Sequence, residues 1–203
     1  MVKVKKVNLN SLVGDDARGR QATVECAGKV KVHFSGDRIV AAIIRRMKRS
    51  DCHYVVGCSA WFTNEKIIKA MSALKGVAMI VTLDRTAVTE SNKRKYRTLP
   101  ILNNAKSAIQ TIGTRGNKWT KSLMHHKFLV FMNEKQEAVA VSNGSFNLTN
   151  AATRHLENVV FHEDSQVASI FKEEFLRLFA ISKPLKLWYI IFTFRIISYF
   201  YFS

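Results

Sequence analysis

Two short apolar runs, at residues 54–60 and 77–83, constrain the fold of this chain more than any other feature. Each run has the length of a buried β-strand, and the segment between them has the pattern of a helix. Asn64 is a suitable N-cap for a helix over 65–75, and Gly76 suits its C-terminal end. Strand, helix and strand at this spacing predict a βαβ unit with two parallel strands.

Other segments add elements around this unit. Residues 30–34 alternate in polarity and predict a strand. Residues 38–49 predict an amphipathic helix, because Ile39, Ile43 and Met47 recur four residues apart.

The second half of the chain predicts a β-hairpin and a long helix. Apolar runs at 128–131 and 138–141 flank a polar turn at 133–137, which is typical of a hairpin. A helix is expected near 101–110 and another over 165–180. The apolar side of the last helix is formed by Phe171, Phe175, Leu178 and Phe179.

The residues with the clearest chemistry lie next to this hairpin. His125 and Lys127 form an H-x-K pair before its first strand, Ser145 and Asn147 form a G-S-x-N turn after its second strand, and Glu157 follows. A histidine can attack phosphorus, a lysine can neutralise phosphate oxygens, and serine and asparagine can hold them. The set indicates phosphodiester chemistry without a metal.

The strand geometry distinguishes the two adjacent histidines. Residues two apart on a strand share one face, so His125 points with Lys127 and His126 points to the other face. We therefore predict that His125 is the nucleophile and that His126 has a packing or hydrogen-bonding role.

In order and spacing these motifs resemble those of the phospholipase D superfamily, in its single-motif, nuclease-like form. The resemblance covers residues from about 28 to 180. At the position of the family's aspartate this chain has Met132, with Asn133 beside it. The resemblance implies an α/β fold with a mixed, mostly parallel β-sheet flanked by helices.

The resemblance also implies a homodimer with the active site at its interface. Family members combine two H-x-K motifs in one site, and here only His125 belongs to such a motif. No lysine lies two residues after His126, and none lies two residues after His33, His53, His155 or His162. One His125 would attack phosphorus and form a phosphohistidine, and His125 of the partner subunit would protonate the leaving oxygen.

The remaining motif residues receive roles from the same resemblance, and no cofactor or metal is implied. Lys127 would neutralise charge, Ser145 and Asn147 would bind the non-bridging oxygens, and Glu157 would accept a hydrogen bond from His125. From the residues alone, Lys127 could be a solvated strand residue, and Ser145 and Asn147 could only shape the turn. Glu157 could equally pair with the nearby Arg154.

The charge of the chain agrees with a phosphate-bearing substrate. Its 32 Lys and Arg residues against 15 Asp and Glu give a net charge of +17, which attracts polyanions but does not separate nucleic acid from an anionic membrane. Residues 85–121 are especially basic, and Tyr96 and Trp119 among these cations could stack on unpaired bases. Alternatively, the span is a solvated loop with Trp119 packed on the core. The predicted substrate-binding residues are Arg85, Lys93, Arg94, Lys95, Arg97, Lys118 and Trp119. Asp84 follows a predicted parallel strand and is either part of a ligand site or a turn residue.

The cysteines predict neither a zinc site nor a disulfide framework. Cys26, Cys52 and Cys58 lack suitable spacing, and the last two are expected to be small buried residues. The first residues lack the continuous apolar core of a secretory signal, which favours a cytoplasmic location.

We expect a polar arm over 1–28, a catalytic domain over 29–182 and an apolar aromatic tail over 183–203. The tail barely reaches the length of about 20 residues that a membrane span needs, and Arg195 lies near its middle. It is interpreted as a membrane anchor, as a segment packed in the core or a subunit interface, or as a non-native extension.

The function predicted from these features is a metal-independent endonuclease that cleaves DNA or RNA. A phospholipase D-type lipid hydrolase is the second interpretation, because the aromatic tail favours membrane association. A nucleic-acid-binding protein without catalysis is the third, since Met132 departs from the family pattern.

Overall fold

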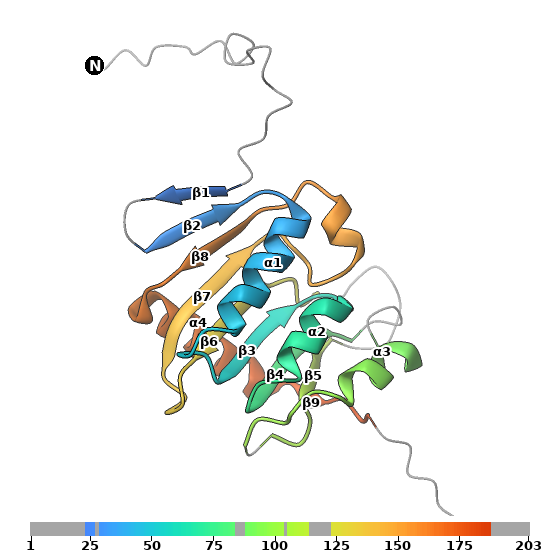
Figure 1. Ribbon diagram of the computed structural model, residues 1–203. Helices are drawn as coiled ribbons and strands as arrows, with labels where there is room; N and C mark the ends of the chain where they lie inside the picture. Colours follow the sequence, from blue (N-terminus) through green and yellow to red (C-terminus); the bar gives the residue numbers. More distant parts are fainter. Residues whose placement is uncertain (1–22, 27–28, 84–87, 104, 114–122, 188–203) are drawn as a thin grey trace, which may run out of the picture.

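The computed structural model describes residues 23–26, 29–83, 88–103, 105–113 and 123–187, which form one mixed β-sheet between helices (Figure 1). The strands are β1 Thr23–Cys26, β2 Val30–His33, β3 Tyr54–Ser59, β4 Gly76–Thr82, β5 Ile109–Ile112, β6 Lys127–Met132, β7 Ala138–Gly144, β8 Val159–His162 and β9 Lys183–Pro184. The helices are α1 Gly36–Met47, α2 Glu65–Met71, α3 Glu90–Tyr96 and α4 Ser165–Ile181, with a 3-10 turn, η2, at Ala151–Arg154. The described strands lie in the order β1-β2-β8-β7-β6-β3-β4-β5-β9.

Two apolar layers hold the sheet between its helices. Successive strand residues point to opposite faces, so each strand contributes to both layers. One layer packs on α1 and α2 and includes Ile39 and Ile43, and the other packs on α4 and includes Phe175 and Leu178. Figure 1 shows α1 and α2 over one face and α4 behind the sheet. The amphipathic helices predicted in both regions are confirmed.

The predicted βαβ unit is confirmed, with one corrected boundary. β3 and β4 pair in parallel, with Tyr54 opposite Gly76. The Asn64 side chain accepts a hydrogen bond from the Ile67 N–H at 3.1 Å, as an N-cap does. The helix ends at Met71, however, and Gly76 begins β4 instead of ending the helix. A Cβ atom on Gly76 would lie 3.1 Å from the Tyr54 ring, so close packing of the strands favours glycine there.

Two further predictions need correction. The sheet is mixed, but among the described pairings only β3–β4 and β4–β5 are parallel, because β6 returns antiparallel to β3 and a hairpin then reverses β7. The helix expected near 101–110 is wrong. Ile101 makes a parallel bridge to Val77, and β5 begins at Ile109. Pairing with the buried strand β4 decides the conformation here, which local sequence does not reveal.

The two cysteines expected to be buried are buried. Burial raises the pKa of Cys52 to about 11 and the pKa of Cys58 to about 12. Both therefore remain neutral thiols at physiological pH and act as packing residues. The Cys26 side chain lies outside the described residues.

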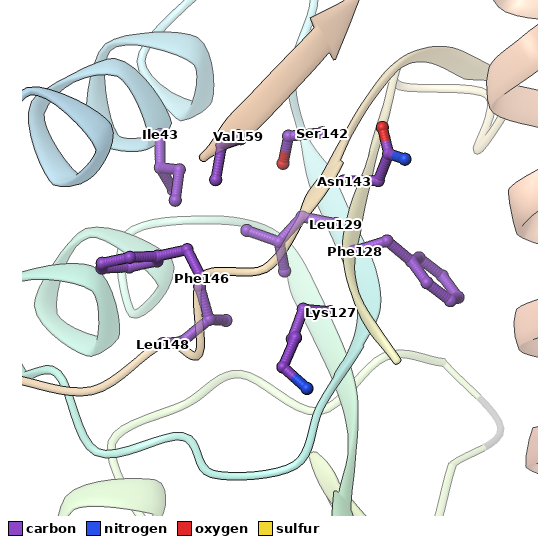
Figure 2. Close-up of a pocket in the computed structure, with 9 residues that line it drawn as sticks. All are labelled: Ile43, Lys127, Phe128, Leu129, Ser142, Asn143, Phe146, Leu148 and Val159. Carbon is purple, nitrogen blue, oxygen red and sulfur yellow. The ribbon is translucent and has the colours of Figure 1, made fainter. Parts of the chain in front are cut away.

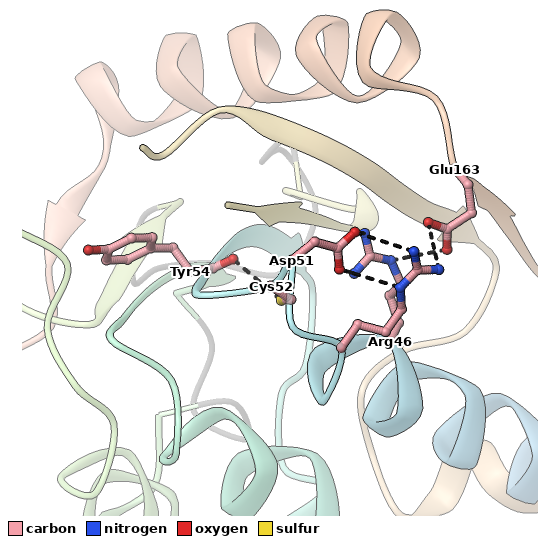
Figure 3. A network of polar contacts seen from close by, with 6 residues as sticks. Arg46, Asp51, Cys52, Tyr54 and Glu163 are labelled. Atoms are coloured by element: carbon pink, nitrogen blue, oxygen red, sulfur yellow. Dashed lines mark hydrogen bonds and ion pairs between the residues drawn. The ribbon is translucent and has the colours of Figure 1, made fainter. Parts of the chain in front are cut away.

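A buried arginine connects α1 to the loop before β3 and to the end of β8 (Figure 3). The Arg46 guanidinium donates to an Asp51 carboxylate oxygen at 2.9 Å and forms an ion pair with Glu163 at 3.0 Å. It also lies 5.2 Å from the centre of the Phe131 ring. Burying an unpaired charge is costly. The carboxylates of Asp51 and Glu163 offset this cost, so that Arg46 can be buried.

The ends of the described chain extend the sheet at both edges. β1 pairs with β2 at one edge, and β9 pairs with β5 at the other. Leu187 then packs in the core. Most of the predicted arm and tail, residues 1–22 and 188–203, lies outside the described residues, so the division into arm, domain and tail stays a prediction. Within the described ranges no helix combines the length and apolar character that a membrane crossing requires.

The N-cap of α2 offers a test of the central βαβ unit. We expect Asn64→Ala to lower the free energy of unfolding by about 1 kcal/mol, because the Ile67 N–H loses its partner, and Asn64→Ser to retain most of it. Urea unfolding followed by circular dichroism measures both changes. Asn150→Ala is the matched control, since Asn150 precedes η2 without a side-chain cap bond. An equal loss in Asn64→Ala and Asn150→Ala would contradict the assigned cap.

Candidate active site

Four chain segments meet on one side of the sheet, where central strands begin or end, and bring the predicted catalytic residues together. We call this side the catalytic edge. The strand register places Ser59 opposite Lys127 and Gly144 opposite Val159. The end of β3, the start of β6, the end of β7 and the start of β8 therefore lie side by side. Figure 2 shows a small pocket at this edge, where Lys127 lies near Phe146 and Leu148 of the turn after β7.

The H-x-K pair enters β6 from this edge. His125 is exposed and lies two residues before the first residue of β6, and its ring meets the Trp61 ring edge-on with centroids 6.5 Å apart. The Lys127 ammonium donates a hydrogen bond to the His125 backbone carbonyl at 2.7 Å. This hydrogen bond connects the Lys127 side chain to the backbone of His125.

The neighbouring histidine lies against a different layer. The His126 Nε2 atom lies 3.5 Å from a Glu174 carboxylate oxygen on α4, and its ring packs at an angle on Phe128. His126 therefore belongs to the α4 side of the sheet, as the alternation of strand side chains predicts.

Lys127 occupies a half-buried position with weakened hydration. Burial lowers the pKa of Lys127 below the ordinary lysine value, and the Glu157 carboxylate acts in the opposite direction. A partly desolvated ammonium has more to gain from an incoming anion than a fully hydrated one. Its position suits neutralisation of phosphate charge.

Ser145 and Glu157 are joined directly. The Ser145 hydroxyl donates to a Glu157 carboxylate oxygen and accepts from the Asn158 N–H at 3.0 Å, while the Ser145 N–H donates to the Asn158 carbonyl at 3.1 Å. The glycine before the serine is required by this close approach, because a Cβ atom on Gly144 would lie 2.1 Å from the Asn158 carbonyl oxygen. The turn after β7 is thereby held to the segment before β8.

The arrangement around Glu157 differs from the predicted one. In the described chain its carboxylate bonds to Ser145, and the hydrogen bond expected from His125 is not formed. Its second oxygen lies 4.0 Å from the Nδ1 atom of His155. His155 is thus a site neighbour that sequence reasoning missed, although its place two residues before Glu157 offered a signal.

Asn147 sits beside this pair with unused hydrogen-bonding capacity. Asn147 lies between Phe146 and Leu148, which are both buried in the core. The side-chain carbonyl oxygens of Asn147 and Asn143 are buried and accept no hydrogen bond within the described structure. Buried polar atoms are normally satisfied, so unused ones at a sheet edge mark a place where a ligand or water completes the bonding.

Met132 lies far from this chemistry. It is the last residue of β6, five residues beyond Lys127, or about 17 Å along an extended strand. Its side chain is buried in the layer that packs on α4. The next residue, Asn133, accepts from the N–H groups of Lys135 and Glu137 at 3.0 and 2.9 Å and so organises the hairpin turn. The residue that replaces the family aspartate therefore lies at the opposite end of β6 from the H-x-K pair.

The predicted substrate-binding cations are largely occupied in local contacts. Lys93 pairs with Glu90 at 2.6 Å, and Lys95 pairs with Glu65 at 2.9 Å. The Arg97 guanidinium donates to the Leu187 carbonyl at 2.6 Å, and Arg94 is exposed on α3. The predicted residues Asp84, Arg85, Lys118 and Trp119 lie outside the described residues.

The expectation that Tyr96 stacks on bases is wrong. Tyr96 is fully buried, its ring stacks on Phe62, and its hydroxyl donates to the Phe62 carbonyl at 2.6 Å. A tyrosine flanked by cations in sequence here faces inward, because α3 buries the side that carries Asn92 and Tyr96.

Comparisons with known proteins agree with this geometry. A family model described as "Cardiolipin synthase, PLD-like domain" matches residues 43–179, which is more than half of the chain. An uncharacterised protein of Acanthamoeba polyphaga mimivirus is 28% identical in a 165-residue alignment that covers 64% of this chain and 59% of that relative. The chain thus spans less than two thirds of the relative's length.

Solved structures share the fold. Nuc from Salmonella typhimurium, described as a phospholipase D family member, superposes with a TM-score of 0.52 at 21% identity, covering 77% of this chain and 97% of Nuc. NucT from Helicobacter pylori gives a TM-score of 0.57 at 13% identity, covering 77% of this chain and 99% of NucT. The predicted phospholipase D-like fold is confirmed.

At the level of the family, these findings support a phosphodiesterase-type enzyme. The match over most of the domain, the shared fold and the ordered motif residues at one sheet edge lead to a single assignment: the chain belongs to the phospholipase D-like family.

Proposed function

We propose that this protein is a metal-independent endonuclease that cleaves DNA or RNA through a phosphohistidine in a homodimer. The observation that carries the proposal is the placement of His125 and Lys127 at the same sheet edge as the bonded pair Ser145 and Glu157. These side chains can supply a nucleophile, charge neutralisation and oxygen ligands for one phosphodiester.

The reaction divides into two displacement steps. In the first, an imidazole nitrogen of His125 forms a bond to phosphorus while the bond to the leaving oxygen breaks, and the second histidine gives that oxygen its proton. In the second, the now neutral histidine takes a proton from water, whose oxygen attacks phosphorus and releases His125. The two identical imidazoles must therefore start in opposite protonation states, one neutral to attack phosphorus and one protonated to supply the proton.

Charge and hydrogen bonding complete the proposed site. Two copies of Lys127, one from each subunit, would neutralise the equatorial phosphate oxygens as the transition state forms. Asn147 would donate its side-chain NH2 group to the same oxygens, and Ser145 would donate its hydroxyl after its bond to Glu157 is exchanged. Glu157 would then be released to orient His125, which accounts for its different partner in the free chain.

Exposed apolar side chains at this edge support the dimer. Phe34 follows β2, Leu123 precedes the H-x-K pair, and Leu156 directly precedes Glu157. All three are exposed, and Leu156 keeps 75% of its surface in contact with solvent. A second copy that completed the active site would cover them, and burial of apolar surface would stabilise the pairing.

A nucleic acid is the favoured substrate, because a chain with a net charge of +17 attracts a polyanion at long range. A lipid phosphodiester is the second candidate, since the matching family model is described by cardiolipin synthase. Both candidates use the same phosphorus chemistry, and the assay must therefore offer both.

The first prediction concerns the nucleophile. We expect wild-type protein to cleave single- or double-stranded DNA or RNA in excess EDTA, and His125→Ala to lose at least roughly 10³-fold in rate, because nucleophile and general acid disappear together. His126→Ala is the matched control and should cleave at nearly the wild-type rate, since His126 faces α4. Gel assays with labelled substrates, and anionic phospholipid vesicles in parallel, measure this.

Three outcomes would reject the proposal. Cleavage that stops in EDTA would overturn the metal-independent mechanism. A His125→Ala variant that cleaves at the wild-type rate would overturn the assignment of the nucleophile. Hydrolysis of the vesicles without cleavage of any nucleic acid would replace the substrate class.

The second prediction concerns the shared site. Equal amounts of wild type and His125→Ala, mixed after reversible dissociation, should retain roughly one quarter of the wild-type activity per total protein, because only dimers with two intact histidines are active. Independent sites in each subunit would retain roughly one half. Mixing with His126→Ala is the control and should leave activity nearly unchanged.

A further inference from the structure

A second, strongly basic groove lies away from the pocket that contains Lys127. It has a volume of about 420 Å³ and runs between α1 and the strands β2 and β8. One wall carries Arg38 and Arg45 of α1 and Arg49, which lies just after the helix. The other wall carries Lys31 of β2. Among the groove residues whose side chains the structure describes, Glu163 is the only carboxylate.

The helix presents its cations as a single row. Arg38, Arg45 and Arg49 are exposed and follow each other at intervals of seven and four residues, which places them on one side of a helix. From Arg38 to Arg49 the row spans about 16 Å along the helix axis. Within the described part of the chain, no carboxylate forms an ion pair with Arg38 or Arg45, whereas Arg49 pairs with Asp51 and Glu163.

The carboxylate of Glu163 does not cancel the positive charge of Arg38 and Arg45. Glu163 lies 3.0 Å from the buried Arg46 and 3.4 Å from Arg49, so its carboxylate is already neutralised within the protein. The groove therefore presents net positive charge to a ligand, and Arg38 and Arg45 have their guanidinium donors available.

The residues that line the groove favour a polynucleotide over a membrane as the ligand. Its wall contains Phe161, which is buried and so presents no stacking face to solvent. The large apolar side chains exposed in the described chain are elsewhere, and a membrane surface would be expected to contact such residues. A concave row of arginines without aromatic platforms suits phosphates and ribose, not bases.

The groove begins at the catalytic edge. The first turn of α1 lies against η2, where a Cβ atom on Gly36 would be 2.3 Å from the Thr153 carbonyl oxygen. Ile43, from another side of the same helix, lines the pocket that contains Lys127. One helix thus separates the candidate active site from the groove, and Arg38 lies at the end nearer to Thr153.

We propose that this groove binds the sugar-phosphate backbone of a nucleic-acid strand at a distance from the phosphodiester that His125 attacks. Binding there would be independent of base sequence and would help to hold long strands on the enzyme. The inference rests on the proposed nuclease function for the identity of its ligand, but it concerns residues outside the catalytic set.

The test is binding of a fluorescein-labelled single-stranded 20-nucleotide DNA or RNA, measured by fluorescence anisotropy across a salt series. The full-length protein carries His125→Ala in all samples, so that no cleavage occurs. The groove variant is Arg38→Gln with Arg45→Gln. The matched control is Lys66→Gln with Lys69→Gln, which removes the same charge from exposed positions on α2. Circular dichroism verifies that all variants are folded.

We expect the groove variant to bind about 25-fold more weakly at 0.1 M salt, and its salt dependence to fall by about 1.4 in the log–log slope, because two phosphate contacts are lost. The control variant should change much less. Equal affinities and slopes for the groove and control variants would overturn the proposal.

Two companion measurements separate this inference from the proposed function. Anionic phospholipid vesicles are offered to the same variants. Loss of vesicle binding with unchanged oligonucleotide binding would overturn the proposal and assign the groove to a membrane. Because binding is measured without turnover, a groove variant that loses affinity supports the groove even if the wild-type protein fails to cleave nucleic acid.

Discussion

The candidate site depends on the pairing of β6 with β3 on one side and with β7 on the other. Both pairings are antiparallel, so the start of β6 meets the ends of its two neighbours. Gly57 permits the close approach, since a Cβ atom there would lie 2.3 Å from the Phe128 carbonyl oxygen. Because β6 is buried on both faces, a slip of one residue would exchange those faces and turn Lys127 away from Ser145.

The protein separates cations that hold the fold from cations that remain available. Arg46 is buried against two carboxylates and fastens α1 to the sheet. Lys127 is half-buried at the candidate site, where burial lowers the pKa of its ammonium group. Arg38 and Arg45, on the same helix as Arg46, stay exposed. The cations behind the net charge of +17 thus occupy three different environments: buried, half-buried and exposed.

Local patterns predicted the elements that local physics controls. The Asn64 cap, the hairpin around Asn133 and the buried stripe of α1 each depend on residues close in sequence, and each is present. Errors arose where distant pairing decides. Ile101 and β5 pair with β4 where a helix was expected, and Tyr96 turns inward because Phe62 offers it both a ring and a carbonyl.

The sequence by itself determined the family, the order of the motif residues and the opposite faces of His125 and His126, because motif spacing and strand alternation are properties of the chain alone. Only the tertiary structure decided that Glu157 bonds to Ser145, that Met132 is remote from the site and that α1 lines a basic groove. These depend on which strands become neighbours, and the order β8-β7-β6-β3 joins segments about 100 residues apart.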